Sequence, residues 1–475
     1  MSLIKKANNY IETNQGFVSD IFRPKFHFHP PIGWMNDPNG LIYFKGYYHV
    51  FYQYYPYDNK WNSMHWGHAR SKDLVHWENL PVALAPDQEY DCDGCFSGSA
   101  IVVNDELVLM YTGVSTVDSV VNQVQCIASS KDGIVFEKYL NNPVIDQENL
   151  ENIGNTVDFR DPKVFKKLDK YYCVVASKKE LRNDETVGLI YIFESEDLKS
   201  WSKASILIEG TKEYGTIWEC PDLFELDDKD VLIISPMRVP ENNGKFSNLN
   251  SVVYMIGKMD WEDLNYQCEF IEELDFGLDF YATQSFLDDS DNRIILSWLQ
   301  TWNRTNVLSD MNVLWSGMLS LPRKINVEDN HIVQSIPENV MSQFNIKETS
   351  SISNEEYEFN AKNYNKFICE NEDNWKIYIG NSKDYSIIFE YKNNKLRVDR
   401  TSYGHLIEGE ENNPNKRSVE IESASTIEIF LDKSSIELFI NGVSISLTYY
   451  AHPQPTKIFV ETSGNISAYS GNVIE

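Results

Sequence analysis

Three acidic residues of the sequence stand directly or nearly before a proline. Asp37 and Asp161 precede Pro38 and Pro162 in the segments WMNDPNG and FRDPKVF, and Glu219 stands two residues before a proline in WECPDLF. Proline disfavours the helical conformation of the residue before it, so we expect each carboxylate at or near the end of an extended strand. Acidic side chains rarely lie in apolar, strand-rich surroundings unless they are paired or used, so three such placements indicate a function.

Paired carboxylates are the usual catalytic groups of glycoside hydrolysis. One donates a proton to the leaving oxygen, while the other attacks the anomeric carbon or activates a water molecule. A third carboxylate can hold sugar hydroxyls. Arg160 adjoins Asp161 and would keep it ionised, whereas Glu219, between Trp218 and Cys220, has more apolar neighbours, which suit a proton donor.

A short phrase recurs along the first two thirds of the chain and indicates a structural repeat. The segments SKDLVHW, SKDGIVF, SEDLKSW and KMDW carry it. Between them lie runs such as AIVVNDELVLMYTGV, whose β-branched and aromatic residues predict strands. A period near 60 residues made of about four short strands is typical of a β-propeller blade. The repeated aspartates are separated by 59, 65 and 63 residues and are Asp73, Asp132, Asp197 and Asp260.

We therefore predict an all-β fold: a five-bladed β-propeller over residues 24–334, followed by a C-terminal β-sandwich. A polar motif precedes each repeated phrase at a similar distance, which would make the motif positions equivalent from blade to blade. Equivalent positions of a closed ring face one axis, so we expect these residues to converge. They are Asp37, Ser97, Asp161, Glu219 and, in the fifth blade, Asp279.

The chain changes character outside this repeat. Residues 1–23 form an N-terminal extension, residues 335–346 are predicted to be a linker with one helical turn, and residues 347–475 are predicted to form the sandwich domain. In the segment SIELFINGVSISL, apolar residues alternate on both sides of Asn441-Gly442, a dipeptide typical of a two-residue hairpin turn. One apolar and one polar face per strand predict sheet packed on sheet.

Composition and charge restrict the partners. The 475 residues include 42 Lys and Arg against 71 Asp and Glu, giving a net charge of −29, which repels phosphate backbones. We therefore expect neither nucleic acid nor an anionic membrane as a partner. The sequence lacks a secretory signal and any apolar stretch of membrane-spanning length, and its seven cysteines are odd in number, so we expect a cytoplasmic protein with reduced thiols.

The sequence predicts no metal site and no cofactor. Cys92 and Cys95 lack the second ligand pair of a zinc site. The histidines at positions 65, 68 and 76 would not gather on one strand face, so we interpret them as structural. The run Asp288–Asp291 lacks the Gly and distal Glu of a calcium loop and is predicted to be a turn.

Several of these motifs together resemble glycoside hydrolase family 32, the invertases, fructanases and sucrose-6-phosphate hydrolases. The similar segments are WMNDPNG, FSGSA, RDPKV, ECPDLF, DFYATQSF, SWLQTW and WSGMLSLPRK, which occur in the family's order across the expected propeller. The similarity in the sandwich region rests mainly on SIELFINGV.

The resemblance implies a retaining mechanism without a metal or cofactor. Asp37 would be the nucleophile, Glu219 the general acid and base, and Asp161 the stabiliser of the transition state, with Cys220 tuning the acid. Trp66, in the same segment as Trp61, is an alternative to it as the tryptophan that contacts the sugar. The sugar-contacting positions that the resemblance implies are Asn36, Gln53, Trp61, Phe96, Ser97, Arg160, Tyr281 and Trp302.

Several alternatives stay open at this level. The covalent intermediate of such an enzyme can pass to water, as in a β-fructofuranosidase, or to a sugar, as in a fructosyltransferase. The substrate would be sucrose, sucrose-6-phosphate or a short fructo-oligosaccharide, with Lys60 or Arg304 as a local phosphate contact. The related five-bladed arabinan-degrading enzymes fit the motifs less well, and a non-catalytic carbohydrate-binding protein would share the scaffold. The oligomeric state and the role of the sandwich are open.

Overall fold

The repeated aspartates each organise the same turn. Asp73 accepts hydrogen bonds from the backbone N–H groups two and three residues ahead, and Asp132, Asp197 and Asp260 do the same. Each turn joins the third and fourth strands of one sheet. The sequence period therefore corresponds to one four-stranded blade, and the Asp side chain satisfies the backbone donors that the turn leaves unpaired.

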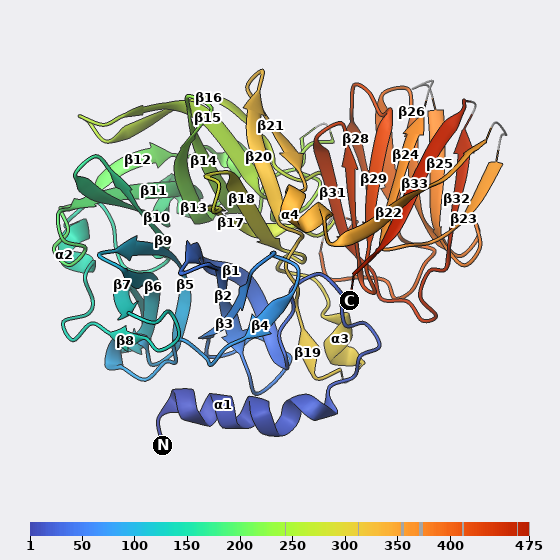
Figure 1. Cartoon of the computed structure of the whole chain (residues 1–475). Coiled ribbons are helices and arrows are strands. Elements are labelled where there is room, and N and C mark those ends of the chain that lie inside the picture. The colour runs from blue at the N-terminus through green and yellow to red at the C-terminus, as the bar shows by residue number, and fades with distance from the viewer. Residues whose placement is uncertain are drawn as a thin grey trace.

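The computed structural model describes residues 1–242, 244–311, 313–352, 356–369, 374–410, 413–462 and 464–474. Figure 1 shows five sheets around a common centre on the left and two facing sheets on the right. The predicted all-β class, a five-bladed propeller followed by a sandwich, is confirmed.

Each blade runs antiparallel from an inner to an outer strand. Blade one has β1 (Gly33–Phe44), β2 (Tyr47–Tyr55), β3 (His65–Ser71) and β4 (Trp77–Asn79), and β19 (Trp315–Ser316) pairs parallel to β1. Blade two has β5 (Gly94–Val103), β6 (Glu106–Val117), β7 (Val120–Ser130) and β8 (Glu137–Lys138). Blade three has β9 (Arg160–Lys167), β10 (Lys170–Glu180), β11 (Thr186–Ser195) and β12 (Ser205–Glu209). Blade four has β13 (Ile217–Leu226), β14 (Lys229–Met237), β15 (Val253–Asp260) and β16 (Asn265–Glu273). Blade five has β17 (Tyr281–Leu287), β18 (Arg293–Trp298), β20 (Arg323–Glu328) and β21 (His331–Ser335).

The five inner strands form a closed ring. β1 contacts β5, β5 contacts β9, β9 contacts β13, β13 contacts β17, and β17 contacts β1. In every blade the pairing between the first and second strands shifts register near the start of the inner strand. Such β-bulges bend a strand and redirect a side chain, so the same device recurs five times around one axis.

Short helices lie outside the sheets. They are α1 (Leu3–Asn14), α2 (Gln147–Leu150), α3 (Val307–Asp310) and α4 (Glu338–Met341). Helix α1 runs below blade one in Figure 1 and is capped by the Ser2 hydroxyl, which accepts a hydrogen bond from the Lys5 N–H. Helix α4 is the helical turn expected after residue 335.

The sandwich consists of two six-stranded sheets. One contains, in spatial order, β22 (Phe344–Ile352), β33 (Ile466–Val473), β24 (Tyr364–Cys369), β29 (Thr426–Leu431), β30 (Ser435–Ile440) and β31 (Val443–Thr448). The other contains β23 (Glu356–Asn360), β32 (Lys457–Thr462), β25 (Asn374–Gly380), β26 (Ser386–Lys392), β27 (Lys395–Asp399) and β28 (Lys416–Glu420). β22 begins inside the segment expected to be a linker. The Asn441-Gly442 hairpin forms as predicted, with positive φ at both residues.

The polar face of that hairpin is buried rather than solvated. Glu437 accepts hydrogen bonds from Arg323 Nε at 3.0 Å and from His27 Nε2 at 2.8 Å, and its side chain is fully buried. Phe439 belongs to a hydrophobic cluster that also contains Phe26 of the N-terminal segment. The sandwich therefore packs this polar face against the propeller. Both faces of the hairpin are buried, the apolar one between the two sheets and the polar one at the boundary between the domains.

Candidate active site

A pocket of about 360 Å³ opens where the inner strands converge. It contains all three predicted catalytic carboxylates and seven of the eight predicted sugar-contacting residues. Tyr281 is the exception: it is buried behind Glu219 and does not line the pocket. The predicted residues that line it are Asn36, Asp37, Gln53, Trp61, Phe96, Ser97, Arg160, Asp161, Glu219 and Trp302.

The bulges of the inner strands place the carboxylates. The register of β1 shifts between Met35 and Pro38, around Asp37, and that of β13 shifts just after Glu219. Asp161 lies in the bulge of β9 with φ at +65°. The expectation of an extended backbone before Pro162 is therefore wrong for Asp161, because the bulge turns this residue into the left-handed region.

Asp37 is held by neutral donors. Ser97 Oγ donates a hydrogen bond to Asp37 Oδ2 at 2.6 Å, and Asn36 Nδ2 donates to Oδ1 at 2.9 Å. Trp34 Nε1 fixes Asn36 in turn at 2.7 Å. Burial, with a smaller contribution from the charge of Glu219, raises the pKa of Asp37 to about 6 even though these two hydrogen bonds lower it. An ionised carboxylate without a cationic partner remains available as a nucleophile.

Glu219 lies against a cation, contrary to the expectation from its sequence neighbours. Arg160 donates from Nε at 3.0 Å and from Nη2 at 2.9 Å to the same oxygen, Glu219 Oε1. The hydroxyl of Tyr281 donates to Oε2 at 2.6 Å and also contacts the Ser235 carbonyl at 3.0 Å. Neighbouring residues of a strand point to opposite faces of the sheet, so Trp218 and Cys220 do not determine the surroundings of the Glu219 side chain.

Asp161 does not pair with the adjacent Arg160 side chain. Its Oδ2 accepts a hydrogen bond from the Cys220 N–H at 2.9 Å, and the Cys220 thiol lies 3.6 Å from the same oxygen. Burial and the charge of Glu219 raise the pKa of Asp161, which overturns the expectation that Arg160 would keep it ionised. The Cys220 thiol also lies 3.8 Å from Asp37 Oδ2, so it stands between two carboxylates. Burial raises the pKa of this thiol, which keeps it protonated.

Aromatic rings form the wall of the pocket. Trp61 is 47% exposed and meets Phe96 edge-on with ring centroids 5.9 Å apart. Trp302 stacks with Trp34 at 6.2 Å. The rival Trp66 is fully buried and donates its indole N–H to the Phe96 carbonyl, so it does not line the pocket. Flat apolar walls with polar edges suit a sugar ring.

Three lining residues were not predicted: Gln123, Asp158 and Met237. Gln123 Oε1 accepts from the Phe159 N–H at 2.8 Å and from Arg160 Nη1 at 3.3 Å. Asp158 accepts from the same nitrogen at 2.9 Å. Asp158 stands two residues before Arg160 in the DFRDP segment and could have been found there, whereas Gln123 and Met237 lie in no motif that we recognised.

Two sequence expectations at the fifth blade are wrong. Asp279 does not converge on the axis: it lies before β17, fully buried, and binds Arg304 at 2.6 Å. Arg304 is buried in this pair and cannot serve as a phosphate contact. Tyr281 takes the position on β17 where the register shifts, as Glu219 does on β13.

The histidines of blade one make contacts within the protein. His68 Nε2 lies 3.0 Å from His49 Nδ1, and His76 contacts Asp73 at 2.8 Å. Within the described residues, no group of three His, Cys, Asp or Glu side chains is gathered to hold a metal ion. The residues Asp288–Asp291 form the turn between β17 and β18, as predicted.

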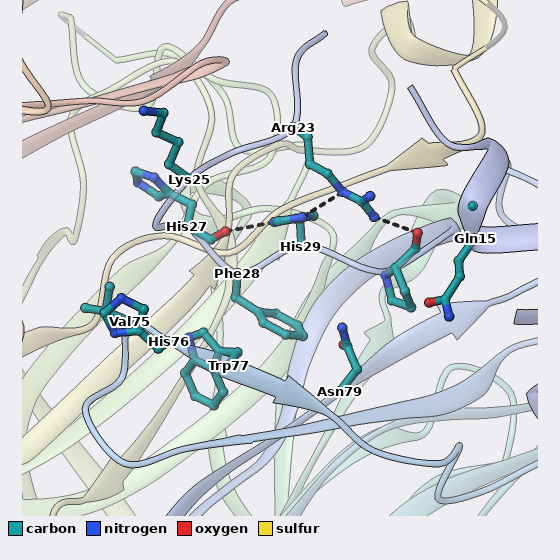
Figure 2. A pocket seen from close by; sticks show the side chains of 12 residues that line it. Gln15, Arg23, Lys25, His27, Phe28, His29, Val75, His76, Trp77 and Asn79 are labelled. Atoms are coloured by element: carbon teal, nitrogen blue, oxygen red, sulfur yellow. Dashed lines mark hydrogen bonds between the residues drawn. The ribbon is translucent and has the colours of Figure 1, made fainter. Parts of the chain in front are cut away.

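A larger hollow of about 600 Å³ lies between the N-terminal segment and the outer edge of blade one (Figure 2). Arg23 donates to His29 Nε2 at 2.9 Å and to the Pro31 carbonyl at 2.6 Å, and His29 Nδ1 donates to the His27 carbonyl at 3.0 Å. These basic groups are engaged within the protein, and none of the three carboxylates lines this hollow. The chemistry therefore belongs to the axial pocket.

Three carboxylates in different environments, set in one aromatic-walled pocket on the axis of a propeller, define a glycoside hydrolase. The sequence comparisons specify the family. The profile of the glycosyl hydrolases family 32 N-terminal domain matches residues 27–336, and that of the family 32 C-terminal domain matches residues 332–473. The chain belongs to glycoside hydrolase family 32 and is an enzyme of the β-fructofuranosidase type.

Individual relatives agree with this assignment. A sucrose-6-phosphate hydrolase of Zymomonas mobilis is 34% identical over 92% of this chain and 88% of its own length. A raffinose invertase of Escherichia coli is 33% identical over 96% of this chain and 94% of its own. The solved structure of a family 32 β-fructofuranosidase from Bombyx mori has a TM-score of 0.85 at 31% identity, covering 99% of this chain and 98% of that one.

Along the part of the chain that the structure describes, no helix combines the length and apolarity required to cross a membrane.

Proposed function

We propose that the protein is a retaining β-fructofuranosidase that hydrolyses the terminal β-D-fructofuranosyl bond of sucrose. The observation that carries this proposal is the contrast between Asp37, held by Ser97 and Asn36, and Glu219, held by Arg160 and Tyr281, in one pocket. The names of the relatives support it: they include sucrose-6-phosphate hydrolases and an invertase, and a second Bombyx mori structure holds sucrose.

The reaction we propose has two steps. An Asp37 oxygen attacks the anomeric carbon of the fructosyl group, and the bond to the glucosyl oxygen breaks as that oxygen takes a proton from Glu219. A covalent fructosyl-enzyme and free glucose result. Glu219, now ionised, takes a proton from water, whose oxygen attacks the same carbon and releases fructose and Asp37.

Asp161 is proposed to hold fructosyl hydroxyls during both steps. Its carboxylate oxygens can accept hydrogen bonds from the hydroxyls, and its Oδ2 is fixed by the backbone N–H of Cys220 at 2.9 Å. The other sugar-contacting residues proposed are Asn36, Gln53, Trp61, Phe96, Ser97, Arg160, Tyr281 and Trp302.

The basic test is fructose release from sucrose by the purified protein. We expect release by the unmodified enzyme and none by Asp37→Asn, because the amide cannot form the covalent intermediate. Sugar binding without turnover by the unmodified protein would contradict the proposal and favour a carbohydrate-binding protein. Analysis of the products for new fructosyl-sugars separates hydrolysis from fructosyl transfer.

The phosphorylated substrate is tested at Lys60. This residue is exposed beside Trp61, whereas Arg304, the other predicted contact, is buried. We expect Lys60→Ala to lower kcat/KM for sucrose-6-phosphate severalfold and to leave sucrose and 1-kestose unchanged, since an ammonium group recognises phosphate as a charge. An equal effect on all three substrates would rule out a phosphate contact at Lys60. A preference for sucrose-6-phosphate would place the enzyme in the cytoplasm, where a charged sugar phosphate is retained.

A further inference from the structure

Asp279 is a fully buried carboxylate at the boundary between the propeller and the sandwich. From the propeller side, Arg304 Nη1 donates to its Oδ1 at 2.6 Å. From the sandwich side, Thr448 donates to Oδ2 through its N–H at 2.7 Å and its hydroxyl at 2.9 Å, and Arg400 binds both oxygens. Glu410 of the sandwich binds Arg304 Nε, so two guanidinium groups face two carboxylates.

The two propeller residues of this cluster lie next to active-site residues in the chain. Asp279 stands two residues before Tyr281, whose hydroxyl holds Glu219 Oε2 at 2.6 Å. Arg304 stands two residues after Trp302, which lines the pocket. Neither Asp279 nor Arg304 lines the pocket itself.

We propose that Asp279, held by Thr448 and Arg400 of the sandwich, is a positioning residue that fixes Tyr281 and through it the proton donor Glu219. The sandwich domain thereby contributes to catalysis without reaching the substrate. This inference rests on the proposed role of Glu219 and assigns a role to the second domain.

The charge of Asp279 is essential to this arrangement. Burial alone would raise the pKa of Asp279, but Arg400 and Arg304 hold it below its ordinary value, so the carboxylate is ionised. Arg400 donates to both of its oxygens, and Arg304 donates to Oδ1. Removing the charge of Asp279 leaves two buried guanidinium groups with one carboxylate, Glu410. A buried positive charge without a compensating negative charge destabilises the folded protein. The segment before β17 would then shift, and small displacements of a catalytic group reduce the rate strongly.

The dependence of the rate loss on the leaving group distinguishes a misplaced Glu219 from general damage to the active site. The glucosyl leaving group of sucrose needs a proton from Glu219 to depart as glucose, whereas p-nitrophenyl β-D-fructofuranoside releases nitrophenolate, which departs without one. We expect Asp279→Asn to lower kcat/KM for sucrose on the order of 10-fold and to change kcat/KM for the nitrophenyl substrate by less than about twofold.

Asp275→Asn is the matched control. Asp275 is also buried at this boundary and binds Arg323 Nη1 at 2.9 Å and Ser446 Oγ at 2.8 Å, but it lies six residues before Tyr281. We expect it to lower stability without a selective loss on sucrose. Equal losses on both substrates for Asp279→Asn, no loss at all, or the same selectivity in Asp275→Asn would each overturn the proposal.

A second pair of variants, with smaller changes, tests the proposal if Asp279→Asn does not fold. Thr448→Val removes one hydroxyl donor to Asp279, and Ser446→Ala removes one donor to Asp275 on the same strand, β31. The proposal requires a selective loss on sucrose for Thr448→Val and none for Ser446→Ala, and equal behaviour of the two would refute it. If the unmodified enzyme releases no fructose from sucrose, the proposed function fails, whereas activity without these selectivities contradicts the positioning role alone.

Discussion

Arg160 donates two hydrogen bonds to a single oxygen of Glu219, at 3.0 Å and 2.9 Å, and does not bond to the side chain of its neighbour Asp161. The other oxygen of Glu219 receives the Tyr281 hydroxyl. Arg160 of blade three therefore binds the carboxylate of Glu219 in blade four. Both oxygens of this proposed proton donor are held by residues of other blades.

This pairing predicts that the geometry at position 160 matters as well as its charge. We expect Arg160→Gln to lower kcat/KM for sucrose about 100-fold, and Arg160→Lys to recover only part of it, since an ammonium cannot reproduce a two-point guanidinium contact. Lys178→Gln is the control: Lys178 pairs with Asp158 at 2.8 Å without touching Glu219. Steady-state kinetics with sucrose test this prediction. A loss of kcat/KM in Lys178→Gln as large as that in Arg160→Gln would show that the positive charge of this region matters and the contact of Arg160 with Glu219 does not.

The acid limb of the pH profile should report Asp37. The attacking carboxylate must be ionised, and its pKa is raised to about 6 by burial, so kcat/KM is expected to fall below that pH. The Ser97 hydroxyl lowers this pKa, so Ser97→Ala should move the acid limb to higher pH. Ser99→Ala removes a hydroxyl that donates to the Pro162 carbonyl instead and should leave the limb unchanged. An unshifted limb in Ser97→Ala, measured from pH 4 to 8, would argue against Asp37 as its source.

The stability of the boundary between the domains should depend on His27. Burial alone would lower its pKa, but hydrogen bonds to Asp432 and Glu437 raise the pKa to about 9. The folded state therefore binds this proton more tightly than the unfolded state, and the resulting stability is full below about pH 6.5 and lost as the pH rises through 9. The contribution is on the order of 3 kcal/mol.

We expect His27→Gln to lower the Tm at pH 6 and to flatten the decline of Tm between pH 6.5 and 9. His76→Gln removes an exposed histidine whose pKa is also raised by its partner Asp73, so it should flatten that decline much less than His27→Gln does. Thermal unfolding followed by circular dichroism at several pH values measures both. An identical decline in His27→Gln and the unmodified protein would contradict the assignment.

Two tryptophans of one segment should behave oppositely. Trp61 is partly exposed at the pocket, so Trp61→Ala should raise KM for sucrose about 10-fold with little effect on Tm, because a sugar-facing wall is lost. Trp66 is buried, so Trp66→Ala should destabilise the fold by about 3–5 kcal/mol. Kinetics and thermal unfolding of both variants test this, and a stability loss in Trp61→Ala equal to that in Trp66→Ala would place both residues in the core.

Much of the architecture was predictable because local chemistry repeats. The aspartates of the recurring phrase close identical turns, so their spacing predicts the blade, and a closed ring of blades predicts convergence of Asp37, Asp161 and Glu219. The Asn441-Gly442 turn was predictable for the same reason: the two residues adopt the positive φ that the tight hairpin demands.

The partners of these residues were decided only by the tertiary structure. Adjacency in sequence suggested an Arg160–Asp161 pair and an apolar Glu219, but side chains alternate across a strand and bulges redirect them, so Arg160 meets Glu219 of another blade. Likewise Asp279 shares its spacing with the axial residues yet faces the sandwich, because it lies before β17 begins. The sequence by itself indicated that Asp37, Asp161 and Glu219 approach the axis, and it indicated the class of chemistry. The ring closure and the docking of the sandwich decided which charges meet, since those contacts join segments that have no local relationship along the chain.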